Sequence, residues 1–208
     1  MRILMLLLVL LSLQHPIVSQ CDNVDEYEIW KEICIQTLGE DKGKELLLQI
    51  LDAKKNDDTV RFLKIMDSLQ TKDLLNMGNV MVGVDDRRGL GANPELSVTA
   101  IVMLPIAKRL DLDLDVTSDA CLNVLQDKTL HPRWRALIAY NLLFEPYESV
   151  KNEKGILIRK RYGIDSLSEK NKQKWLKVLV HIREDASEDT QVRRNAERSI
   201  EKLQYILK

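Results

Sequence analysis

The chain has 208 residues, in which 31 Lys and Arg stand against 32 Asp and Glu, giving a formal net charge of −1. Hydrophobic residues make up 45% of it, and 8 Gly and 5 Pro are too few for a fibrous or low-complexity protein. Enough Leu, Ile and Val is present to fill a core, which excludes global disorder. The near-neutral charge lacks the basic excess of a nucleic-acid-binding domain, so we expect no nucleic-acid partner.

Residues 1–19 have the pattern of a secretory signal peptide. Met1 and Arg2 give a positive start, and the nine residues from Ile3 to Leu11 are all apolar. This run is about half of the ~20 residues that a transmembrane helix needs, and no other stretch approaches that length. We therefore expect an exported protein, secreted or periplasmic, whose mature chain has no transmembrane segment.

The three cysteines raise two questions, the cellular location of the protein and the presence of a disulfide. Val18–Cys21 is similar to the lipoprotein box of bacteria, with Gln20 where a small residue is usual, so a lipid anchor at Cys21 on an envelope protein is the second possibility. Cys34 and Cys121 either form one disulfide or remain thiols. Both stand among apolar helical residues, which favours buried free thiols.

Apolar residues at three- and four-residue spacing predict three helices in the first part of the mature chain. These helices cover Val24–Leu38, about Lys42–Lys55 and Val60–Leu69. Gly39 is a natural end for the first helix, and the turn Asn56–Asp58 supplies a side-chain cap for the third.

The next segment is less regular. Thr71–Met77 has a helical pattern, but Gly78 and Gly83 interrupt it, and the composition of Asp85–Ala92 predicts a loop. Asn93-Pro94 then predicts a new helix start, because asparagine caps helices and proline suits the first helical position.

In the second half, Thr117 or Ser118 is expected to cap a short helix, and His131-Pro132 opens another. Tyr147–Asp165 is the longest connection, within which Ile156–Ile158 is expected to form a short strand or a turn of helix. A capping box at Ser166 and Glu169 precedes a further helix. The apolar stripes of the last two helices consist of Trp175, Leu179 and Ile182, and of Val192, Ala196, Ile200, Leu203 and Leu207.

Each predicted helix has one apolar stripe and a charged back. Such helices bury their stripes by packing as antiparallel pairs. We therefore expect an all-α fold, an irregular stack of antiparallel helical hairpins that forms one domain over residues 20–208.

Two helix starts resemble the second helix of HEAT repeats. The matching residues are Pro132, Trp134, Arg135, Ala139 and Leu142, and then Asp189, Val192, Arg193, Ala196 and Ile200. The resemblance implies a HEAT-like α-solenoid, in which small residues allow close helix approach and the arginine reaches a carboxylate or carbonyl in a neighbouring turn. Convergent amphipathic helix pairs would give the same stack. The matches are 58 residues apart, against about 40–47 in regular repeats, so the stack is expected to be irregular.

No metal site or cofactor is expected from the residue pattern. The acidic run Asp111–Asp119 has Val116 and Leu122 where a calcium loop needs glycine and glutamate, so it indicates a solvated turn between helices. The mature chain also lacks the clustered ligands of a zinc site. His131 is expected to be a capping or surface residue, and His181 to lie at the edge of its helix.

Two segments are candidate binding sites. In the first, flexible backbone, two guanidinium groups and exposed N–H groups precede a helix start, which suits an anion or carboxylate; the residues are Arg87, Arg88, Gly89, Gly91 and Asn93. An ordinary mobile loop is the alternative. The second is a basic cluster that suits a phosphate-bearing or acidic partner, formed by Arg159, Lys160 and Arg161. A solvated connector is the alternative there.

These features favour an exported, non-enzymatic helical-repeat-like scaffold that binds another macromolecule, most simply another protein. One alternative is a helical enzyme with a dispersed site near residues 85–93, using Asp85, Asp86 and Arg88. The other is a carrier with an apolar cavity between its helices, lined by residues such as Met77, Met81 and Met103.

Overall fold

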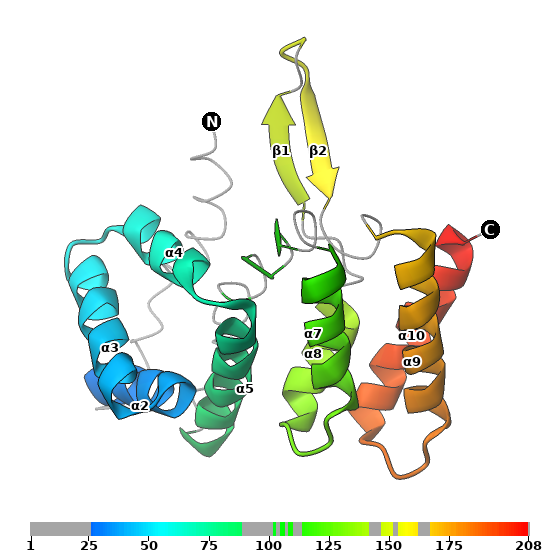
Figure 1. Ribbon diagram of the computed structural model, residues 1–208, viewed down its shortest axis with the longest axis horizontal. Coiled ribbons are helices and arrows are strands. Elements are labelled where there is room, and N and C mark those ends of the chain that lie inside the picture. Colours follow the sequence, from blue (N-terminus) through cyan, green and yellow to red (C-terminus); the bar gives the residue numbers. More distant parts are fainter. Residues whose placement is uncertain are drawn as a thin grey trace. The chain divides into compact units, whose positions relative to one another are not determined.

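The computed structural model of the chain describes residues 26–88, 102, 105–106, 108–109, 114–141, 147–151, 154–161 and 167–207 (Figure 1). Most of these residues are α-helical, as the sequence predicts. They fall into two compact units that meet in sequence between Pro105 and Ile106. The sequence pattern predicts one domain over residues 20–208 and gives no sign of this division.

The N-terminal unit contains four helices: α2 (Glu26–Leu38), α3 (Glu40–Lys55), α4 (Thr59–Ser68) and α5 (Thr71–Arg88). Helix α2 packs against α3 and α5, and α3 packs against α4. Gly39, with φ of +82°, makes the break between α2 and α3. Asp58 caps α4, its side chain accepting a hydrogen bond from the Arg61 N–H at 2.9 Å. The helix end at Gly39 and the cap at Asp58 both occur where the sequence predicts them.

Helix α5 corrects one prediction. It continues through Gly78 and Gly83 to Arg88, so the expected break and the expected start of a loop at Asp85 are wrong. A glycine inside a helix costs about 1 kcal/mol. Helix α5 buries a whole apolar face, including Leu74 and Met81, and each such side chain contributes roughly 1.5–3 kcal/mol. Tertiary packing therefore outweighs the local preference.

Gly43 allows α2 and α3 to lie very close together. A Cβ atom at this position would lie 2.7 Å from both the Cys34 carbonyl oxygen and the Ile35 Cα. Both contacts are with backbone, which cannot rotate away as a side chain can. Only glycine therefore fits at this crossing of the two helices.

We expect Gly43→Ala to lower the free energy of unfolding by about 1–3 kcal/mol, because the added methyl group pushes the two helices apart. Gly83→Ala is the matched control, since its Cβ would meet only the flexible Arg87 side chain, at 3.3 Å. That variant should be neutral or stabilising, as alanine is the better helix former. Urea unfolding followed by circular dichroism measures both, and equal effects would contradict the close approach.

The C-terminal unit contains two helical hairpins. The first is α7 (Leu114–Gln126) with α8 (Pro132–Asn141), and the second is α9 (Glu169–Glu184) with α10 (Thr190–Ile206). A two-stranded antiparallel ribbon, β1 (Tyr147–Lys151) and β2 (Leu157–Arg161), lies between them in sequence. Its register pairs the first residue of β1 with the last of β2. Of the two forms expected for 156–158, residues 157 and 158 adopt the strand.

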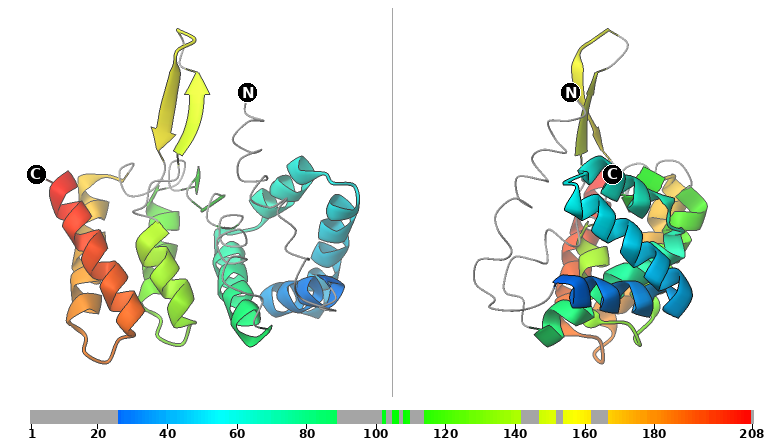
Figure 2. Two further views of the ribbon diagram at one scale, coloured as in Figure 1. Left: turned by 180° about the vertical axis from the view of Figure 1, so that it is seen from behind. Right: turned by 90° about the vertical axis from the view of Figure 1, so that its left-hand side faces the viewer.

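The two hairpins pack side by side, with α7 against α9 and α8 against α10 (Figures 1 and 2). The Trp175 indole donates to the Ser118 hydroxyl at 2.9 Å, and the Ser199 hydroxyl donates to the Ala139 carbonyl at 2.8 Å. Among the described residues, five hydrogen bonds from a helix of one hairpin to a helix of the other join residues 55 to 60 positions apart. This near-constant separation means that each helix runs parallel to its counterpart in the other hairpin.

The helix starts of this unit follow the sequence only in part. Pro132 opens α8, as expected, and the structure shows in addition that Asp189 caps α10. Helix α7, however, begins at Leu114, so Thr117 and Ser118 are not caps but are buried inside the helix. Ser168, not Ser166, caps α9 through the Asn171 N–H.

The apolar stripes predicted for α9 and α10 form the core of this unit. Trp175 and Val192 are fully buried, and Ala196, the alanine of the second HEAT-like match, is fully buried as well. Ala136 and Ala139 of α8 are also fully buried where α10 crosses them. Small residues thus stand where side chains of α10 hydrogen-bond to the backbone of α8.

Candidate functional site

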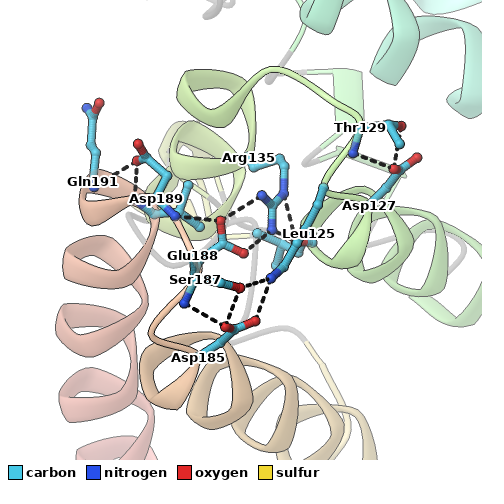
Figure 3. Close-up of polar contacts among 11 residues, drawn as sticks. Leu125, Asp127, Thr129, Arg135, Asp185, Ser187, Glu188, Asp189 and Gln191 are labelled. Atoms are coloured by element: carbon cyan, nitrogen blue, oxygen red, sulfur yellow. Dashed lines mark hydrogen bonds and ion pairs between the residues drawn. The ribbon is translucent and has the colours of Figure 1, made fainter.

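A buried ion pair joins the two hairpins at their turns (Figure 3). The Arg135 and Glu188 side chains are only 2% and 4% exposed. Nη1 and Nη2 of Arg135 donate to the two oxygens of Glu188 at 2.8 and 2.5 Å, and Nε and Nη2 donate to the Leu125 carbonyl at 3.0 and 2.6 Å. Every nitrogen of the guanidinium therefore has an acceptor, and the arginine ties α7, α8 and the α9–α10 turn together.

The two turns repeat one structure. The Asp127 carboxylate accepts from the Thr129 N–H, and the Asp185 carboxylate accepts from the Ser187 N–H, each at 2.9 Å. Corresponding residues are 58 positions apart, as are Arg135 and Arg193. Lys128 bridges the two turns, its ammonium donating to Asp185 at 2.6 Å and to Ser187 at 2.7 Å (Figure 3). The hairpins are therefore fixed to each other by charge-assisted bonds as well as by packing.

The acidic groups of the α9–α10 turn are held in the charged form. Hydrogen bonds from Lys128 and Ser187 lower the pKa of the Asp185 carboxyl. Burial raises the pKa of Glu188, but hydrogen bonds from Arg135 and from the Asp189 N–H together lower it more, so that it lies below its ordinary value of 4.5. Both carboxylates therefore stabilise the fold while they are ionised.

The free energy of unfolding is expected to fall as the pH drops below 4.5. The folded-state pKa of Glu188 lies below the unfolded-state value, so its contribution is complete above that value and is lost as the pH falls through the folded-state pKa. Glu188→Gln removes this titration, so its unfolding free energy should change less between about pH 7 and about pH 3 than that of the wild type. Urea unfolding across this range measures the two slopes, and equal slopes would refute the assignment.

The predicted anion-binding residues Arg87 and Arg88 lie at the end of α5 and contact a carboxylate of their own chain. Nη2 of Arg87 donates to Glu32 at 2.5 Å, and Nη2 of Arg88 donates to the other oxygen of Glu32 at 2.8 Å. Hydrogen bonds from Arg88 and Arg87 lower the pKa of Glu32. An anion at this position would have to displace Glu32. Gly89, Gly91 and Asn93 lie outside the described residues, so the complete site stays a prediction.

Helix α2 and the end of α5 also enclose an open hollow of about 320 Å³. Its lining comprises Glu28, Lys31, Glu32, Ile35, Gln36 and Arg88. This mixture of charges is balanced and the hollow is open to solvent, so it selects neither anions nor cations.

The basic cluster Arg159, Lys160 and Arg161 lies in β2. These residues pair with Ser149, Glu148 and Tyr147 of β1. Within the described part of the chain the sheet has only these two strands, so each strand has one edge without a strand partner. The cluster that composition alone suggests thus stands on a strand with an open edge rather than in an irregular connection.

The residues proposed for an enzyme are not gathered in the hollow. It includes Arg88, but its lining contains neither Asp85 nor Asp86, and no histidine. His131 acts as a cap, its Nδ1 accepting from the Arg133 N–H at 3.3 Å, and His181 is exposed on α9. Both histidines are as the sequence predicts.

The methionines proposed for a carrier belong to the packed core of the N-terminal unit. Met77 is fully buried and Met81 is 2% exposed. Met103 lies outside the described residues. The two described methionines fill the interior beside residues such as Leu74.

The acidic residues of α7 serve the packing of hairpins. The expected turn is wrong for Asp115 and Asp119, which are exposed residues of α7: Asp115 accepts from Asn171 at 3.0 Å and Asp119 pairs with Lys174, both of α9. Asp111 and Asp113 lie outside the described residues. Over the described ranges, no three His, Cys, Asp or Glu side chains gather as metal ligands. Nor does any helix in those ranges have the length and apolar character to cross a bilayer.

Cys34 and Cys121 are buried free thiols, which confirms the favoured alternative. Burial raises the pKa of each to about 12. Neither thiol is therefore prepared to act as a nucleophile near neutral pH.

Sequence reasoning missed Glu188, Lys128 and Ser118 as the residues that connect the hairpins. One signal was present: the pattern Asp-x-Thr/Ser recurs at Asp127 and Asp185, at the same separation as the two HEAT-like arginines.

Comparisons of the chain with protein families, curated proteins and solved structures find no match.

Proposed function

We propose that the protein is an exported, non-enzymatic scaffold of the HEAT-like type, which binds an acidic partner protein. The observation that carries this proposal is the connection of two parallel hairpins through Arg135, Glu188 and Lys128. The ribbon β1–β2 lies between these two hairpins in sequence. A fixed platform lowers the entropy that is lost when a partner binds.

The ribbon supports the choice of partner. Among the described strands, one edge of β2 has no strand partner, and it offers backbone donors and acceptors to an extended segment of another protein. Three consecutive basic residues, Arg159 to Arg161, favour a segment that carries acidic or phosphorylated residues.

The test uses the full chain in its native host, with cross-linking and identification of bound proteins by mass spectrometry. Changing Arg159, Lys160 and Arg161 together to serine should abolish recovery of the partner. The matched control removes the same charge from exposed positions of the N-terminal unit, by changing Lys55, Lys64 and Lys72 to serine. Equal recovery with both variants, or no partner with the wild type, would refute the proposal.

Export is part of the same proposal, and its support is the leader pattern of residues 1–19. Intact mass spectrometry of the protein from its native host distinguishes the alternatives. A chain that begins at Gln20 supports simple export, and a lipid-modified Cys21 at the first position supports an envelope anchor. A chain that retains Met1 refutes both.

A further inference from the structure

The register of the ribbon β1–β2 divides its charged residues between two faces. Alternate residues of a strand lie on the same face, and residues directly opposite each other on paired strands share a face. One face, here called the basic face, therefore comprises Tyr147, Ser149, Lys151, Leu157, Arg159 and Arg161. The other, called the neutral face, comprises Glu148, Val150, Ile158 and Lys160. The three consecutive basic residues of β2 are thus separated, with Lys160 on the opposite face from its two neighbours.

The two faces differ in charge. Among the residues paired in the ribbon, the neutral face holds one positive and one negative charge, because Lys160 stands opposite Glu148. Opposite charges at such positions attract each other, so Lys160 has a counter-charge within the ribbon. The basic face holds no acidic residue among the paired positions, and its positive charges come from Lys151, Arg159 and Arg161. Charge therefore makes the basic face the one that favours an anionic partner.

The edge of β2 that has no strand partner among the described strands is where an added strand meets this charge. A segment paired with β2 places its own alternate residues beside Arg159 and Arg161, since every strand rises about 3.3 Å per residue. Paired with β1, the same segment would meet Lys151 as the only cation of the basic face. Within the described part of the chain each strand packs mainly against the other, and no helix covers the ribbon to a comparable extent. The edge of β2 is therefore the favoured place for an acidic segment.

We propose that the edge of β2 binds an extended segment of the partner protein that carries aspartate or glutamate at two alternate positions. The two acidic residues lie on the basic face, beside Arg159 and Arg161, and the residue between them lies on the neutral face, beside Lys160. A segment with two consecutive acidic residues can place only one of them on the basic face. The inference rests on the proposed scaffold function and adds the spacing of charges that a partner needs.

The probes are two acetylated and amidated peptides of the same composition, three threonines and two glutamates. The glutamates stand at the second and fourth positions of the alternating peptide, and at the second and third positions of the consecutive peptide. Each is titrated into the ¹⁵N-labelled full-length protein at low ionic strength, and nuclear magnetic resonance follows the backbone amide signals of β2. We expect the alternating peptide to bind about two- to fivefold more tightly, which is the effect of one additional cross-strand pair of opposite charges. Because the two peptides have equal charge, general attraction gives no such difference.

Two variants that each remove one positive charge from β2 test the division between the faces. Arg161→Met leaves Arg159 as the only cation of β2 on the basic face, so the preference for the alternating peptide should disappear. Lys160→Met is the matched control. It should weaken the binding of both peptides and keep the preference, because Lys160 lies on the neutral face. Lys160 thus contributes general attraction, whereas Arg159 and Arg161 select the spacing.

Equal binding of the two peptides by the wild-type protein, or binding of neither, would overturn the inference, and this comparison does not depend on the folding of a variant. Loss of the preference in Lys160→Met, or its retention in Arg161→Met, would overturn it as well. Failure of the scaffold function is recognised separately. A preference for the alternating peptide with no partner recovered from the native host would refute the scaffold and keep the required spacing. A partner recovered from the host, together with equal binding of the two peptides, would do the opposite.

Discussion

Glu188→Ala is expected to lower the free energy of unfolding by about 3–5 kcal/mol, because it leaves the buried Arg135 charge without its partner. Arg135 would keep only the Leu125 carbonyl as an acceptor. Urea unfolding of the full chain, followed by circular dichroism, measures the effect. The matched control is Glu184→Ala, which removes an exposed carboxylate that pairs with Arg183 and should change stability by less than about 0.5 kcal/mol.

A double variant separates the net contribution of the ion pair to the free energy of unfolding from the cost of leaving one buried charge unpaired. Arg135→Met with Glu188→Leu removes both charges, and apolar replacements of similar volume for a buried pair are often nearly neutral. The Leu125 carbonyl then lacks its donor, so a loss of about 1–3 kcal/mol should remain. A Glu188→Ala loss below about 1 kcal/mol would show that water reaches Arg135 and that the hairpins are not fixed at this point.

Trp175→Ala is expected to destabilise the C-terminal unit by about 3–5 kcal/mol. Trp175 is fully buried between α9 and α7, and its indole donates to the Ser118 hydroxyl at 2.9 Å. The substitution removes the largest side chain at this contact and leaves a cavity. Unfolding curves measured with the same method give the difference, and a loss below about 1.5 kcal/mol would mean that the two hairpins can collapse around the missing ring.

The chain also contains a matched tryptophan. Trp134 is fully buried like Trp175, but its Nε1 has no hydrogen-bond partner among the described residues. Both Trp→Phe changes remove similar volume, yet only Trp175→Phe breaks a hydrogen bond. Trp175→Phe should therefore cost about 1–2 kcal/mol more than Trp134→Phe. Equal costs would show that the bond to Ser118 contributes nothing.

Periodicity predicts the helices and their buried stripes well. Trp175 and Leu179 are spaced for one face of α9, Val192 and Ala196 for one face of α10, and all four are fully buried. The turn at Asp58 is predictable for the same reason, since a cap depends only on residues next to it in sequence. Local signals are reliable where local interactions determine the structure.

The contacts between hairpins depend on residues far apart in sequence. The HEAT resemblance implies that Arg135 reaches a carboxylate or carbonyl, but Glu188 is 53 positions away and nothing near Arg135 identifies it. The prediction of a break in α5 is wrong for the opposite reason. Its glycines suggest a break, and only the packing of α5 against α2 shows that the helix continues.

The ribbon lies in the connection between the two hairpins, so the C-terminal unit should tolerate changes in the length of that connection. The connection from Asn141 to Glu169 must close for the hairpins to dock, and the entropy lost in closing a flexible loop rises only with the logarithm of its length. Halving or doubling such a loop alters stability by only about 0.6 kcal/mol. Excising residues 147–161 should therefore leave the docked helices almost as stable as before. Natural variation can lengthen, shorten or rewrite this insertion with little effect on the helices that carry it.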